Sequence, residues 1–88
     1  MKWKHDVKIE RADGIWLIRG DMRKRVEKDD EIIVNLMESG IESDDELIKK
    51  AEDAFQGEGE GVGFRLAQFV ENYGAFLAEG TKSKVFDL

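Results

Sequence analysis

The chain has 88 residues, which is enough for one domain with one modest hydrophobic core and too few for two domains. It contains no cysteine, so disulfide bonds and thiolate metal sites are excluded. The formal net charge is −6, but residues 1–28 carry nine Lys or Arg against five Asp or Glu, whereas residues 29–88 carry five against fifteen. This division indicates that the two parts attract different partners, because the summed charge of each part steers what approaches it.

Targeting and membrane-spanning segments are not predicted. The first residues lack the apolar stretch of a secretory signal, and no apolar run approaches the length of a bilayer span. We therefore expect a cytoplasmic protein that does not bind membranes. Apolar residues make up 41% of the chain and follow regular patterns, so we expect a folded chain despite its high charge.

A β-hairpin is predicted for residues 7–19, because two β-prone runs flank Asp13-Gly14, a dipeptide that favours a two-residue type I′ turn. A two-residue loop puts Arg11 opposite Trp16. One face of the hairpin, which we expect in the core, then holds an apolar and aromatic cluster: Val7, Ile9, Trp16 and Ile18.

The second strand of this hairpin is apolar on both faces and therefore needs a further neighbour. Residues 22–26 supply it if Gly20-Asp21 forms another tight turn, and the tail of residues 82–88 supplies it if the chain end returns to the sheet. The first arrangement is preferred because it needs no long-range closure of the chain. The sequence leaves open whether residues 21–28 are strand or helix and whether the tail joins the sheet.

Three helices are predicted beyond residue 28, where apolar residues recur every three or four positions. The first begins at Asp29 and ends before Gly40, and the second begins with a capping box at Ser43 and stops at Gly57. The third is predicted to end at Gly80. Its apolar stripe consists of Leu66, Phe69, Val70, Tyr73, Phe76 and Leu77.

The predicted fold class is α+β, with an N-terminal antiparallel β-hairpin or three-stranded meander packed against three C-terminal helices. We expect one small domain over residues 1–88, with a basic hairpin region at 1–28 and an acidic three-helix region at 29–80. Residues 57–63 are rich in Gly and Glu and are predicted to form a flexible loop, and residues 81–88 form the tail.

Neither a catalytic site nor a metal or cofactor site is predicted. His5 is the sole histidine, and the serines lie at helix ends or in the tail, without a base and an orienting group beside them. The acidic clusters at residues 29–31 and 42–46 lack the pattern of a calcium loop and are better explained as helix N-terminal charge. The loop at residues 57–63 lacks the Lys-Ser/Thr of a phosphate-binding loop. We therefore expect a non-enzymatic protein without cofactors.

The preferred functional hypothesis is a small acidic protein-interaction module, an inhibitor or regulator that binds a basic, nucleic-acid-binding surface of a partner protein. Acidic side chains along the second helix and the loop after it can complement such a surface. The interface predicted on this basis consists of Glu42, Asp44, Asp45, Glu52, Asp53, Glu58 and Glu60. A solvated helix face explains the same acidic residues equally well.

The first alternative is a small nucleic-acid-binding protein that uses the basic hairpin region. Basic residues interleaved with aromatic residues supply phosphate contacts together with base stacking. The interface predicted for this alternative consists of Lys8, Arg11, Arg19, Arg23, Lys24 and Arg25. The second alternative is a structural subunit of a homo-oligomer. The sequence leaves open the partner, the pathway and the oligomeric state.

Overall fold

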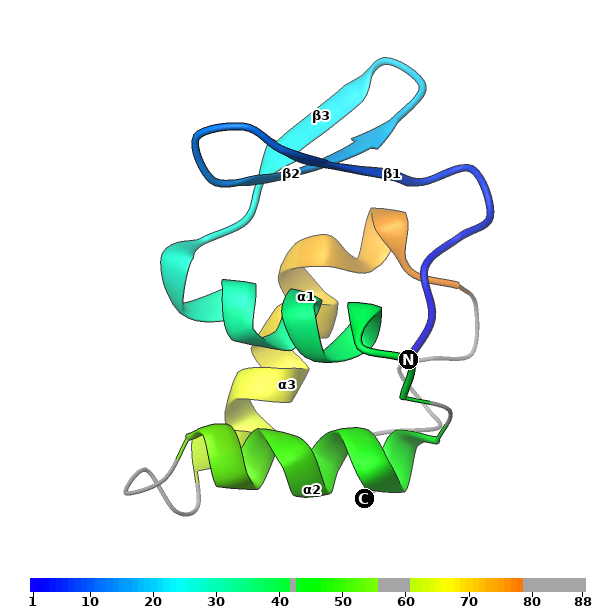
Figure 1. Cartoon of the computed structure of the whole chain (residues 1–88). Helices are drawn as coiled ribbons and strands as arrows, with labels where there is room; N and C mark the ends of the chain where they lie inside the picture. The colour runs from blue at the N-terminus through cyan, green and yellow to red at the C-terminus, as the bar shows by residue number, and fades with distance from the viewer. Residues whose placement is uncertain (42, 56–60, 79–88) are drawn as a thin grey trace.

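The computed structural model describes residues 1–41, 43–55 and 61–78 and shows an α+β arrangement, with a three-stranded antiparallel sheet stacked on a layer of helices (Figure 1). The strand order in space is β1-β2-β3, the same as in the sequence. The elements in chain order are β1 (Lys8–Arg11), β2 (Ile15–Arg19), β3 (Met22–Arg25), the 3-10 turn η1 (Lys28–Asp30), α1 (Glu31–Glu38), α2 (Asp44–Ala54), α3 (Gly61–Tyr73) and the 3-10 turn η2 (Gly74–Phe76).

The predicted meander is confirmed, because the residues after Gly20 form a strand that pairs with β2. In this antiparallel pairing Trp16 lies opposite Arg25 and Ile18 lies opposite Arg23. Gly20 has a φ of 58°, which a glycine adopts without the steric cost of a side chain and which allows the tight reversal between β2 and β3. The other candidate neighbour, the tail of residues 82–88, lies outside the described residues.

The register of the β1–β2 hairpin is shifted by one residue from the prediction. Arg11 pairs with Ile15, not with Trp16, so three residues, 12–14, form the loop. Asp13 and Gly14 both have positive φ, at 55° and 106°, as the dipeptide indicated. Ala12 joins them, as in the three-residue hairpin loops that are next in frequency after two-residue ones.

This shift reverses the predicted core face of the hairpin. A one-residue change of register moves every side chain of a strand to the opposite face relative to its partner. Ile15 and Leu17 are 3% and 0% exposed and face the helices together with Ile9. The prediction that Trp16 and Ile18 lie in the core is therefore wrong: both are partly exposed and point away from it.

The first two helices form where the sequence predicted them. The Oγ of Ser43 accepts a hydrogen bond from the N–H of Glu46 (3.1 Å), which is the predicted cap of α2. Gly40 follows α1 with a φ of 89°, the left-handed conformation that commonly ends a helix. The predicted stop of the second helix at Gly57 lies outside the described residues.

α3 begins earlier than predicted. Residues 61–63 form its first turn, whereas the sequence analysis assigned them to a flexible loop, and the rest of that loop, residues 57–60, lies outside the described residues. Val62 is 5% exposed and belongs to the core. Tertiary packing of this kind stabilises helical turns whose intrinsic propensity is poor, including one with two glycines.

α3 also ends earlier than predicted, at Tyr73, and the 3-10 turn η2 follows it. The predicted stop at Gly80 lies outside the described residues. Beyond η2 the chain is extended, and Leu77 forms an isolated antiparallel β-bridge with Trp3 of the N-terminal segment. In that pairing the N–H of Lys4 donates to the carbonyl oxygen of Phe76 (2.9 Å).

The hydrophobic core lies between the inner face of the sheet and the helices, and α3 supplies much of it. Trp3 packs edge-on against Phe69 with ring centroids 6.2 Å apart, and Phe69 packs against Tyr73 at 4.7 Å. The predicted apolar stripe is buried at every position: Leu66, Phe69, Val70, Tyr73, Phe76 and Leu77.

Replacing Gly14 with Ala is expected to lower the free energy of unfolding by about 1 kcal/mol, because a side chain strains the backbone at a φ of 106°. The new Cβ would also lie 2.8 Å from Nε of Arg25, so that side chain would have to move. Chemical denaturation measures the loss. Gly63→Ala is the control, since its Cβ meets open space and the helix gains propensity. Equal stability of the Gly14→Ala variant and the parent would contradict the described turn.

Candidate functional site

The most distinctive surface in the described part of the chain is the face of the sheet that none of its helices covers (Figure 1). Side chains alternate between the two faces of a strand, so each strand contributes two of them to this side. We call this set of six residues the outer sheet face: Lys8 and Glu10 from β1, Trp16 and Ile18 from β2, and Arg23 and Arg25 from β3.

Trp16 lies in the middle strand of the outer sheet face, and two guanidinium groups lie near its ring. The Cζ of Arg23 is 4.9 Å from the ring centroid and that of Arg25 is 6.0 Å from it, both within the range of cation–π attraction. The indole N–H of Trp16 donates to the carbonyl oxygen of Ala12 (3.1 Å). These contacts hold the ring in one orientation at the surface.

Glu10 is the single acidic member of the outer sheet face. Its carboxylate accepts a hydrogen bond from Arg23 at 3.1 Å, and both side chains are about half exposed. Exposed pairs of this kind contribute little to stability and exchange readily with other partners. The face therefore presents three cationic side chains and one carboxylate.

The other half of the predicted basic interface points the opposite way. Arg11, Arg19 and Lys24 alternate with the outward residues and reach toward the helices. Arg11 donates to the side-chain oxygen of Asn35 at 2.8 Å. Arg19 donates to the backbone oxygen of Ala75 at 3.3 Å. These contacts connect the sheet to the helices, and the three cations lie on the other side of the sheet from the outer sheet face, although Arg11 and Lys24 keep exposed surface.

Lys24 shows this role most clearly. Its ammonium group donates to the backbone oxygen of Asn72 at 2.7 Å, in the last turn of α3. It also lies 5.0 Å from the centroid of the Tyr73 ring, a cation–π contact. A cation near a helix C-terminus is favoured by the helix dipole, so Lys24 stabilises the contact of β3 with α3.

The residues of the predicted acidic interface differ in their surroundings. Asp44 accepts a hydrogen bond from the amino group of Met1, so it is an ion-pair partner within the fold. Asp45, Glu52 and Asp53 are exposed on α2. The remaining predicted members, Glu42, Glu58 and Glu60, lie outside the described residues.

Lys49 interrupts the acidic side of α2. It lies four residues from Asp45 and from Asp53 and three residues from Glu52, which places it beside all three on the helix surface. The described part of this helix therefore offers alternating charges, and an interface there would need a partner that complements both signs.

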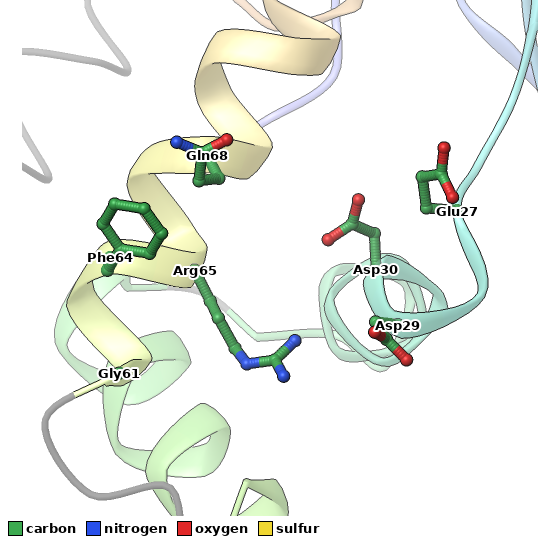
Figure 2. Close-up of a pocket in the computed structure, with 7 residues that line it drawn as sticks. All are labelled: Glu27, Asp29, Asp30, Gly61, Phe64, Arg65 and Gln68. Atoms are coloured by element: carbon green, nitrogen blue, oxygen red, sulfur yellow. The ribbon is translucent and has the colours of Figure 1, made fainter.

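A hollow that the sequence analysis missed lies between α3 and the η1–α1 junction (Figure 2). Its volume is about 400 Å³, and its lining consists of Glu27, Asp29, Asp30, Gly61, Phe64, Arg65 and Gln68. Phe64 is one of the residues that line the hollow, and it is 68% exposed. Arg65 extends from α3 toward Asp29 and Asp30. The signal in the sequence was Phe64 itself, an aromatic residue that lies off the apolar stripe of its helix.

The side of the hollow formed by Glu27 and Asp30 is attached to α3 through Tyr73. Its hydroxyl group donates to Oδ2 of Asp30 and accepts from the backbone N–H of Glu27, both at 2.9 Å. Burial raises the pKa of Tyr73 to about 12, and the bond to Asp30 adds to the shift. Burial also raises the pKa of Asp30, against the opposing effect of the hydrogen bond from Tyr73.

The remaining structural observations concern metals, membranes and relatives. Within residues 1–41, 43–55 and 61–78, no group of three or more His, Cys, Asp or Glu side chains is arranged to hold a metal ion. Over the same residues, no helix has the length and apolar character needed to cross a bilayer.

Comparison with protein-family models, with curated proteins and with solved structures found no match to this chain.

Asp30→Asn is expected to make the stability of the fold less dependent on pH. The pKa of Asp30 is higher in the folded state than its unfolded value near 3.8, so protonation of this carboxyl group favours folding. The contribution is fully present below the unfolded pKa and is lost as the pH rises through the folded pKa. The asparagine oxygen still accepts from Tyr73, so the variant should gain stability relative to the parent between about pH 3 and pH 7.

Urea unfolding of both proteins across this pH range measures the difference. Asp29→Asn is the matched control, since it removes one carboxylate from the same 3-10 turn at an exposed position. A difference between Asp30→Asn and parent that stays constant with pH would show that burial of Asp30 does not perturb its ionisation.

Proposed function

We propose that the protein binds nucleic acid through the outer sheet face. The observation that supports this function best is the position of Trp16, a partly exposed tryptophan in the middle strand with the guanidinium groups of Arg23 and Arg25 over its ring. Cationic side chains gain affinity for nucleic acid by neutralising phosphates and releasing counterions, and an aromatic ring adds a surface for stacking. A role in the core would explain a tryptophan equally well, but Trp16 points away from the core.

The distribution of charge supports the same proposal despite the net charge of −6. The sheet lies at one end of the molecule and α2 at the other, with α1 and α3 between them (Figure 1). The acidic residues Asp45, Glu52 and Asp53 are on α2, far from the outer sheet face. Such a charge separation orients the molecule in the field of a polyanion, so that the sheet approaches first.

Replacing Arg23 and Arg25 together with Gln is expected to weaken binding to a labelled oligonucleotide at least tenfold at low salt. Loss of two phosphate contacts should also reduce the slope of log affinity against log salt by about 1.4 to 1.8. Fluorescence anisotropy across a salt series measures both quantities. Glu10→Gln should act in the opposite direction, because it removes the carboxylate that holds Arg23.

Lys49→Gln combined with Lys50→Gln is the matched control, because it removes the same charge from α2 and leaves the outer sheet face intact. The control should keep the affinity and the salt slope of the parent. The proposal is wrong if the parent protein binds neither DNA nor RNA at low salt, or if the control and the arginine variant lose affinity equally.

The second candidate function is the preferred hypothesis from the sequence, the binding of a basic, nucleic-acid-binding surface of a partner protein. The hollow beside Phe64 supports it, since three carboxylates, one cation (Arg65) and one exposed aromatic ring lie around a volume of about 400 Å³, which leaves the lining acidic. Carboxylates and an aromatic ring together suit a lysine or arginine side chain, which has an apolar stem and a cationic end. The interface on α2 stays a prediction.

A variant in which Asp45, Glu52 and Asp53 are all replaced by Lys distinguishes an interface on α2 from an interface at the hollow beside Phe64. If α2 is the interface, association with an arginine- and lysine-rich peptide should slow strongly while dissociation changes little, because charge at a rim acts mainly on encounter. If the hollow is the interface, Phe64→Ser should speed dissociation instead. Surface plasmon resonance resolves the two rates, and circular dichroism checks folding. Unchanged rates in both variants would contradict this second candidate.

A further inference from the structure

We infer that the nucleic acid bound by the outer sheet face is single-stranded, with a base stacked on Trp16 and adjacent phosphates bound by Arg23 and Arg25. This inference rests on the proposed nucleic-acid binding and names its substrate class. It follows from the shape of the face, from the way the Trp16 ring is held, and from the spacing of the cations around it.

The shape of the face differs from that of the elements with which proteins usually read a duplex. Three strands about 4.8 Å apart form a face about 10 Å wide, and the helices behind it add further width. The major groove of B-DNA is about 12 Å wide and admits a helix or a two-stranded ribbon. The outer sheet face has one strand more than such a ribbon, side chains on both of its rims and helices behind it, so it is better suited to lying on a nucleic acid than to entering the groove of a duplex.

The chemistry of Trp16 calls for an unpaired base. Inside a duplex each base is stacked on its neighbours and offers only its edges, whereas an aromatic side chain binds the face of a base. The bond from the indole N–H to Ala12 keeps the ring in one orientation before any ligand arrives. Such preorganisation lowers the entropy that is lost on binding.

The guanidinium groups of Arg23 and Arg25 lie over the Trp16 ring in the free protein, and a base that stacks there would displace them toward the neighbouring phosphates. Arg23 and Arg25 are two residues apart on the same face of β3, so their Cα atoms are about 6.6 Å apart, a distance comparable with that between successive phosphates of an extended strand. Both guanidinium groups are planar and stack on bases as well as binding phosphates. Lys8 adds a third cation on the far strand, beyond Ile18.

The test compares an oligonucleotide of about 12 nucleotides with the duplex of the same sequence, a length within the range of single-strand site sizes. We expect the single strand to bind at least tenfold more tightly at one fixed, low salt concentration. Trp16→Leu, which keeps an apolar side chain but removes the ring, should weaken single-strand binding about 5- to 150-fold. The same change should leave duplex binding within about twofold of the parent, because duplex binding depends on phosphate contacts.

Tryptophan fluorescence gives an independent readout of stacking. Trp3→Phe leaves Trp16 as the one remaining tryptophan, and its emission should be quenched by the single strand and not by the duplex. Trp3 packs against Phe69 in the core, so circular dichroism must confirm the fold of this variant. The comparison of Trp16→Leu with the parent does not depend on it.

The possible results distinguish a failure of the single-strand inference from a failure of the proposed nucleic-acid binding. Equal affinity for single strand and duplex, unchanged in Trp16→Leu, would overturn the single-strand assignment and leave nucleic-acid binding in place. Absence of binding to either form at low salt would overturn both. A dimer in sedimentation experiments that Trp16→Leu dissociates would show that a second copy of the chain covers this face, and would also overturn the inference.

Discussion

The burial of Ile15 and Leu17 against the helices determines the direction of every other side chain in the sheet. Leu17 is completely buried, and its neighbours in β2 must therefore point outward because side chains alternate along a strand. The pairing of β2 with β3 then places Arg23 and Arg25 on the same side as Trp16. The candidate nucleic-acid surface is thus a consequence of how the core is packed, and moving β2 by one residue would bury Trp16 and remove that surface.

The same constraint explains which parts of the fold could be predicted from the sequence. The apolar stripe of α3 and the cap at Ser43 depend on residues three or four apart, and local pattern was sufficient to predict them. The β1–β2 register was not predictable in this way, since β2 is apolar on both faces and Ile9 finds an apolar partner in either register. The choice between the two registers is made by the helices, which lie far along the sequence.

The candidate surface was predictable only in part, for a related reason. The sequence alone presents six basic residues as one group, whereas the side chains of Arg11, Arg19 and Lys24 contact the helical side and the other three belong to the outer sheet face. Alternation along each strand separates the two groups once the register is known. Basic residues in a small sheet can therefore hold layers together, and their number alone is a poor measure of a binding surface.

The position of β3 at an edge of the described sheet has a consequence for the behaviour of the protein at high concentration. An open edge can accept a strand from another molecule, which leads to aggregation. Arg23, Lys24 and Arg25 are consecutive and exposed there, so two such edges repel each other. This repulsion acts over about 10 Å at 0.1 M salt and shortens as salt is added. Pairing of two such edges should therefore become easier as the ionic strength increases.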